Sequence, residues 1–183
     1  MEEVEKFVRS KLLPYFVEVH VEVVLKEAEY LLNFYPNADK EVVKYGCWLH
    51  DVGIKFGEKN VKGYARVDKS GEPHHLVSLR LAKEFLKTTN LPEDKVRNIL
   101  HCVESHRTST PPDPETIEAK IVASADNLAH FVMAGFMIKM WEKESVVRKL
   151  KRDLDFPFML PEALERAKKL SLEIEKKFNV KIL

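Results

Sequence analysis

The order of apolar and polar residues along the chain has the period of an α-helix. Apolar residues recur at every third or fourth position in segments that are separated by Pro, Gly and Asn, and no long segment alternates strictly as a strand would. This pattern predicts an all-α protein, a compact single-domain helical bundle. The predicted helices span residues 2–13, 16–34, 39–51, 74–87, 92–106, 114–143, 146–154 and 161–178.

Capping residues support several of these boundaries. Asp39 is a favourable N-cap, and Pro92, Pro114 and Pro161 suit a first helical turn, where the missing N–H of proline costs nothing. Pro14 is expected to end the first helix.

Two polar segments interrupt the helical pattern. Residues 55–73 form a long polar stretch, and residues 107–113 read RTSTPPD. Long loops in compact domains tend to carry function, so both segments are candidates for the mouth of a site.

The size and charge of the chain limit its organisation and partners. A chain of 183 residues with 45% hydrophobic content fits one domain, with a core over about 16–143 and C-terminal helices in 144–183 packed on it. The net charge is +1 and basic residues are interleaved with acidic ones, so no nucleic-acid polymer is indicated as a partner. The oligomeric state stays open, with a homodimer as one option.

No run of about 20 apolar residues is present for a membrane span, and the first residues, MEEVEKFVRS, lack the order of a signal peptide. We therefore expect a cytoplasmic protein. Cys47 and Cys102 lie within apolar helical patterns, and a reducing compartment favours core packing over a disulfide for them.

Three interruptions of the apolar helix faces stand out, and His20 is the first. His20 shares a stripe with Phe16, Val24 and Leu31, so its ring should face the interior. An inward histidine by itself is either a hydrogen-bonded core residue or a ligand.

The second interruption is the sequence CWLHDVG at residues 47–53. His50 and Asp51 are adjacent at the end of an apolar run, and Gly53 is a helix-stop residue. Neighbouring residues diverge by about 100° within a helix, but at a helix end both side chains can turn towards one point.

The third interruption is Asp126 in KIVASADNLAHFVMAGF. Asp126 shares the inner face of the most apolar helix with Val122, Ala129 and Met133. A buried, unpaired carboxylate costs several kcal/mol, and a nearby cation removes that cost. The alternatives are a buried salt bridge or a capping hydrogen bond.

Two imidazoles and two carboxylates that point into one helical bundle suit a divalent metal ion. Their order, a His, then His-Asp about 30 residues later, then Asp about 75 residues further, closely resembles the HD superfamily of metal-dependent phosphohydrolases. The resemblance spans roughly residues 16–134. It implies that the metal ligands are His20, His50, Asp51 and Asp126.

Two further histidines match positions at which some members of this superfamily bind a second metal. His74, with His75 as the alternative, opens a helix, and His106 closes one. The resemblance implies one or two divalent ions, drawn from Mn, Fe, Co, Ni and Zn, with Asp51 as the bridge if there are two. His130 is expected in the core or behind the ligands, and His101 on a helix face.

The resemblance implies hydrolysis of a nucleotide or another small phosphoester or phosphoanhydride. Asp51 and Asp126 would lie near the attacking hydroxide, with Lys55 as a further catalytic candidate. Arg66 and Arg107 are candidates for binding substrate phosphate from the two loops, although Arg66 has an equal claim to be a solvated loop residue.

Other members of the same superfamily define the alternatives. The 5′-deoxynucleotidase and guanosine-tetraphosphate hydrolase branches carry acidic residues soon after the HD pair, whereas this chain reads VGIK at 52–55, so it points to neither branch. A di-iron oxygenase of the HD fold and a metal-containing ligand-binding module without turnover are the alternative functions.

Overall fold

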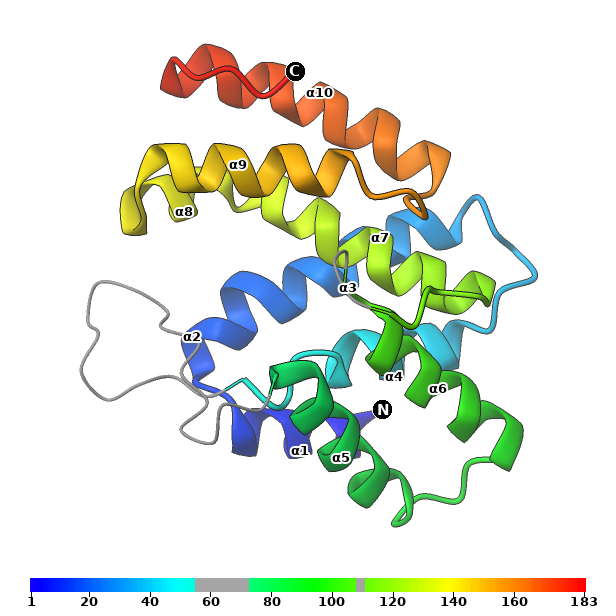
Figure 1. The fold of residues 1–183 in the computed structure, drawn as a ribbon. Coiled ribbons are helices and arrows are strands. Elements are labelled where there is room, and N and C mark those ends of the chain that lie inside the picture. The colour runs from blue at the N-terminus through cyan, green and yellow to red at the C-terminus, as the bar shows by residue number, and fades with distance from the viewer. Residues whose placement is uncertain (55–72, 108–110) are drawn as a thin grey trace.

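The computed structural model of the chain describes residues 1–54, 73–107 and 111–183, and within these ranges the regular secondary structure is entirely helical (Figure 1). The prediction of an all-α fold is confirmed. The elements are α1 (Glu2–Lys11), α2 (Pro14–Phe16), the π-helix η1 (Val17–Val21), α3 (Glu22–Leu32), α4 (Lys40–Leu49), α5 (His74–Leu86), α6 (Glu93–Ser105), α7 (Ile117–Val132), α8 (Ala134–Met140), α9 (Lys143–Leu154) and α10 (Pro161–Phe178).

Several helices begin where their capping residues predict. Asp39 caps α4, because its Oδ1 accepts hydrogen bonds from the backbone N–H groups of Glu41 and Val42 at 2.9 and 3.2 Å. Pro161 occupies the first turn of α10. The predicted start at Pro114 is wrong by three residues, because Thr116 supplies the N-cap side chain of α7.

The segment predicted as one helix over residues 16–34 is a composite. Pro14 begins α2 instead of only ending α1, and a π-helical turn, η1, joins α2 to α3. Wider turns of this kind often occur at functional sites because they change which side chains face inward. Here the widened turn contains His20.

The segment predicted as one helix over residues 114–143 is also divided. α7 and α8 meet at Met133 with a bend of 62°. None of the described helices is by itself long and apolar enough to cross a membrane, and α7 with α8 meets these criteria only as this bent pair.

α7 is the central helix of the bundle, with α3, α4, α6 and α10 packed around it (Figure 1). It is apolar on nearly every side, and Ile121, Val122, Ala125 and Leu128 are all fully buried. A helix that is hydrophobic all round must be enclosed by others. Asp126 is therefore carried into the middle of the protein.

Gly46 allows α4 to lie close to α6 and α7. A Cβ atom at Gly46 would come within 2.9 Å of both Cys102 Cβ and Val122 Cγ2, closer than real Cβ contacts. Cys47 and Cys102 are buried free thiols, as the apolar pattern predicts, and burial raises the pKa of both.

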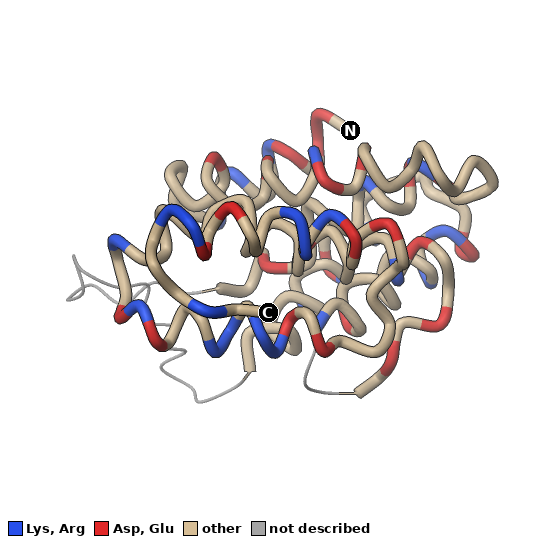
Figure 2. Tube along the Cα trace, turned by 90° about the horizontal axis from the view of Figure 1, so that it is seen from above, with Lys and Arg blue, Asp and Glu red and all other residues tan. Residues whose placement is uncertain are grey.

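The C-terminal helices α9 and α10 pack against α7 and α8. α10 is also tied to α3, because Arg166 donates to the buried Glu27 carboxylate at 2.6 and 2.8 Å. Figure 2 shows Lys and Arg interspersed with Asp and Glu along the helices. The division into a core over 16–143 and a packed C-terminal region stays a prediction.

Candidate metal centre

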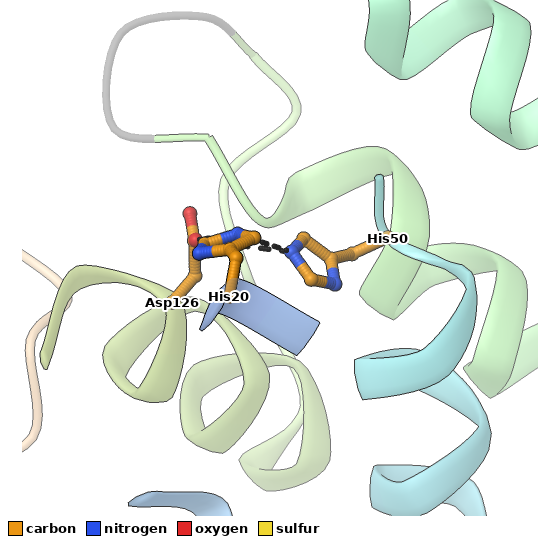
Figure 3. Close-up of side chains that lie close together, drawn as sticks. All are labelled: His20, His50 and Asp126. Carbon is orange, nitrogen blue, oxygen red and sulfur yellow. Dashed lines mark hydrogen bonds and ion pairs between the residues drawn. The ribbon is translucent and has the colours of Figure 1, made fainter. Parts of the chain in front are cut away.

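The first cluster of ligand-type side chains unites residues from three helical segments. The Nε2 atom of His20, from η1, lies 3.2 Å from His50 Nε2 and 3.3 Å from Asp126 Oδ1 (Figure 3). His50 caps the end of α4, and Asp126 lies in the second half of α7. One ligand atom from each of the three lies within 4.8 Å of the others, which is close enough for a single metal ion to contact all three.

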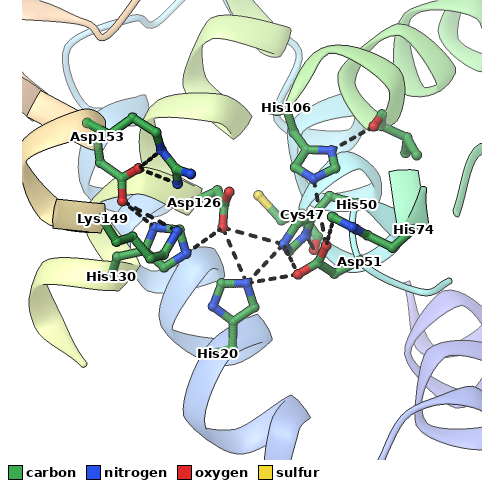
Figure 4. A network of polar contacts seen from close by, with 12 residues as sticks. His20, Cys47, His50, Asp51, His74, His106, Asp126, His130, Lys149 and Asp153 are labelled. Atoms are coloured by element: carbon green, nitrogen blue, oxygen red, sulfur yellow. Dashed lines mark hydrogen bonds and ion pairs between the residues drawn. The ribbon is translucent and has the colours of Figure 1, made fainter. Parts of the chain in front are cut away.

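The second cluster is built on Asp51, which follows His50 directly. Asp51 Oδ1 lies 3.3 Å from His74 Nε2 and 3.7 Å from His106 Nε2, while its Oδ2 turns to His20 Nε2 at 3.3 Å (Figure 4). The carboxylate therefore faces both clusters. This is how adjacent residues at a helix end come to serve two neighbouring groups of ligands.

A buried carboxylate oxygen of Asp51 provides the test of whether a metal fits. Asp51 Oδ1 is buried and accepts no hydrogen bond within the described residues, although the ring nitrogens of His74 and His106 face it at 3.3 and 3.7 Å. A buried carboxylate oxygen without a hydrogen bond is costly, and a cation shared with these ring nitrogens would remove that cost. Together with the imidazole and carboxylate donor set, this favours a divalent ion beside it.

Backbone carbonyls fix the orientation of two histidine rings. The Nδ1 of His50 donates to Cys47 O, and the Nδ1 of His106 donates to Val103 O, both at 2.7 Å. A neutral imidazole that donates from Nδ1 carries its lone pair on Nε2. In their neutral, metal-binding form both rings would therefore turn this lone pair to the clusters, as in metal sites whose ligand tautomer is set by a hydrogen bond behind the ring.

The charges in the cluster interact strongly in the metal-free protein. Burial opposes a positive His20, but the hydrogen bonds to Asp126 and Asp51 outweigh burial and raise the pKa of His20 to about 9. Burial also opposes ionisation of Asp51, yet the charges of His50 and the hydrogen bond from His20 hold the pKa of Asp51 well below its ordinary value.

The pKa values of Asp126 and His106 are also shifted, each for its own reason. Burial disfavours ionisation of Asp126, but the charge of His130 and the hydrogen bond from His20 keep its pKa well below its ordinary value. The pKa of His106 falls to about 3, because the ring is buried and lies near His50. The cluster thus presents ionised carboxylates and a neutral His106, the forms that bind metal ions.

Gly53 is the reason that His74 reaches Asp51. A Cβ atom at Gly53 would lie 2.4 Å from Ser78 N and 2.8 Å from His74 O, so only glycine lets the first turn of α5 pack on the turn at residues 50–53. The Gly53 N–H donates to Ser78 Oγ at 2.9 Å and ties the two segments together. The sequence predicted Gly53 only as a helix stop. The structure shows that Gly53 also lies against the backbone of α5.

The structure distinguishes the roles of His74 and His75. His74 Nε2 faces Asp51, whereas His75 Nδ1 accepts a hydrogen bond from Arg107 Nη1 at 2.9 Å. Burial and the charge of Arg107 lower the pKa of His75. Of the two histidines, His74 is thus the one gathered with Asp51 and His106.

The remaining predicted residues are Lys55, Arg66, Arg107 and His101. Lys55 and Arg66 lie outside the described residues, so their roles stay predictions. Arg107 directly follows His106 in the chain and contacts His75, and its role in binding phosphate also stays a prediction. His101 lies away from the clusters, where its Nε2 accepts from the N–H of Glu115 at 2.9 Å.

The sequence pattern did not reveal Asp153. This residue is fully buried in α9, and its Oδ2 accepts a hydrogen bond from His130 Nδ1 at 2.9 Å. A charged residue in a highly charged helix such as α9 gives no indication of burial by itself. A small clue was its place on the same face as Val146 and Leu150, which are both buried.

Comparison with known protein families agrees with this geometry. The HD domain family model matches residues 17–130, more than half of the chain. The chain therefore belongs to the HD domain family, as the order of His20, His50, Asp51 and Asp126 predicted. HD domains bind divalent metals, and the family consists mostly of metal-dependent hydrolases. Comparisons with curated proteins and with solved structures gave no match.

Proposed function

We propose that this protein is a metal-dependent phosphohydrolase that acts on a nucleotide or another small phosphoester or phosphoanhydride. The observation that carries the proposal is the pair of clusters joined at the adjacent residues His50 and Asp51. In the proposed arrangement, His20, His50 and Asp126 would hold one divalent ion, and Asp51, His74 and His106 would hold a second, with the Asp51 carboxylate also facing the first. Mn, Fe, Co, Ni and Zn all suit these ligands.

Divalent ions in such a site would lower the pKa of a water molecule towards neutrality and neutralise phosphoryl oxygens. Asp51 and Asp126 would place ionised carboxylates beside the attacking water, and Asp126 would accept a hydrogen bond from it. Burial of Asp51 strengthens these interactions, because charges act over a lower effective dielectric constant away from bulk water.

The exposed edges of the clusters suggest how substrate enters. The side chains of Asp126 and His74 are 13% and 12% exposed, whereas that of His50 is fully buried. A small substrate would therefore approach past Asp126 and His74. Arg107 follows the ligand His106 and is proposed to contact phosphate, and the same role is proposed for Lys55 and Arg66. A cytoplasmic location belongs to this proposal.

Phosphate release by metal-loaded protein tests the proposed function. Protein stripped with a chelator and reloaded with Mn²⁺, Co²⁺, Ni²⁺ or Fe²⁺ should release phosphate from members of a panel of nucleotides, dinucleoside polyphosphates and simple phosphate esters. Chelation should abolish the release. Exclusion of oxygen should leave the rate unchanged, because hydrolysis consumes only water.

His50→Ala should lose both metal and phosphate release, and His101→Ala is the matched control. His101 is a histidine of α6 whose ring is engaged with Glu115 N, outside both clusters, so its loss should leave metal content and rate intact. Oxygen consumption that stops under argon would instead indicate an oxygenase. Metal binding without turnover on the whole panel would indicate a binding module.

A further inference from the structure

His130 and Asp153 form a hydrogen-bonded pair directly behind the first cluster. His130 lies one turn after Asp126 in α7, and Asp153 lies in α9. His130 Nδ1 is 2.9 Å from Asp153 Oδ2, and His130 Nε2 is 3.7 Å from Asp126 Oδ1 (Figure 4). The imidazole therefore stands between two carboxylates, bonded to one and separated from the other.

Asp153 is held in place from more than one side. Its Oδ1 accepts from Arg152 Nη2 at 3.0 Å, and Lys149 Nζ lies 3.5 Å from its Oδ2. A carboxylate can only accept hydrogen bonds here, so Nδ1 of His130 carries a proton, and in the neutral ring the lone pair is on Nε2. This leaves Nε2 as the atom that His130 presents to Asp126 and to the first cluster.

The separation between His130 Nε2 and Asp126 Oδ1 is the informative distance. At 3.7 Å these two atoms are too far apart for a direct hydrogen bond. A water molecule about 2.8 Å from each could donate one hydrogen to Nε2 and the other to Oδ1. With both hydrogens held, the oxygen lone pairs point away from the two side chains.

We propose that His130 and Asp126 together hold the attacking water, and that Asp153 is a positioning residue that fixes the His130 tautomer. This inference rests on the proposed phosphohydrolase function and adds residues that lie outside the two ligand clusters. His20 supports the arrangement, because its ring is stacked on that of His130 at 5.7 Å with an interplanar angle of 10°. The His20 ring and the carboxylates of Asp126 and Asp153 then leave little freedom for the His130 ring to rotate.

Two substitutions at His130 test the roles of its two ring nitrogen atoms separately. The amide of Asn reaches the position of Nδ1 and can still donate to Asp153, but nothing replaces Nε2. The amide of Gln reaches the position of Nε2, where its oxygen can accept from water. His130→Asn should lower kcat by about 100-fold with little change in KM or in metal content, because the attacking water loses its orientation. His130→Gln should recover a measurable part of kcat.

Asp153→Asn tests the positioning role. The Asn oxygen should remain with Arg152, so its NH₂ group turns to His130 Nδ1 and forces the ring proton onto Nε2. This variant should lose kcat to a similar extent as His130→Asn while the protein retains its metal. A purely structural pair would give a different result: lower thermal stability in all three variants, with unchanged kcat per folded, metal-loaded molecule and no advantage of Gln over Asn.

A crystal structure of the metal-loaded wild-type protein tests the proposed position of the attacking water without any measurement of turnover. The proposal requires a water oxygen within about 2.6–3.2 Å of both His130 Nε2 and Asp126. Direct bonding of Nε2 to the metal ion or to Asp126 would overturn it. If wild-type protein hydrolysed no phosphoester, the proposed function would fail, whereas the position of this water would still test the role of His130.

Discussion

Replacing Gly53 with alanine should remove one metal ion without destroying the fold. The added Cβ atom would lie 2.4 Å from Ser78 N and 2.8 Å from His74 O and Val77 C. All three are backbone atoms, so no side-chain rotation can make room. The first turn of α5 must move by about 1 Å to reach an ordinary contact of 3.4 Å.

The consequences for metal and stability follow from that displacement. His74 lies in this turn, and its Nε2 is 3.3 Å from Asp51 Oδ1, so a shift of about 1 Å separates it from the second cluster. Overpacking of this kind costs about 1–3 kcal/mol of unfolding free energy. The first cluster has no residue on α5, so its ion should remain.

Elemental analysis of reloaded protein and urea denaturation measure both effects. We expect Gly53→Ala to bind about one ion fewer than wild type and to unfold at lower urea. Gly135→Ala is the matched control, because the added Cβ would meet only the ring end of Phe178, at 3.1 Å. Wild-type metal content and stability in Gly53→Ala would refute the argument that glycine is needed for α5 to reach Asp51.

Three further predictions concern the metal, the charges and the packing. His106→Ala should lower metal stoichiometry by about one ion while the first cluster stays loaded, and equal loss of both ions would contradict two separable clusters. In metal-free protein the pKa of His20 is raised to about 9, so its stabilising contribution is complete below the unfolded-state pKa of 6.5 and is lost as pH rises through 9. The advantage of wild type over His20→Asn in urea unfolding should therefore shrink by on the order of 3 kcal/mol between about pH 6 and pH 10, and a constant difference would refute the ion pairs. Gly46→Ala should cost about 1–3 kcal/mol, partly recovered when Val122→Ala makes room, and full additivity in a double-mutant cycle would contradict the close contact.

The helices and their apolar faces could be read from the sequence because burial imposes a regular period. The interior direction of His20 and Asp126 was predicted from that period, and both are buried. Local departures from the period could not be predicted. The π-helical turn at Val17–Val21 and the bend at Met133 depend on packing between segments distant in the chain.

Contacts between distant segments also limited the prediction of the site. The sequence favoured His74 over the adjacent His75 only through the family resemblance, and the approach of α5 to Gly53 is what brings His74 to Asp51. Asp153 was not identified, because its burial depends on how α9 packs against α7. The residue types were therefore enough to predict a metal site. The contacts of each side chain could not be predicted, because they depend on how the helices pack.

Anomalous diffraction from crystals of the metal-loaded protein tests the central claim most directly. We predict two peaks, one among His20, His50 and Asp126 and the other among Asp51, His74 and His106. Two-metal hydrolytic sites place their ions about 3.5–4 Å apart, and the peaks should have this separation. A single peak in fully loaded protein would show that only one ion binds and would contradict the second metal position. No peak in either cluster would contradict the metal centre itself.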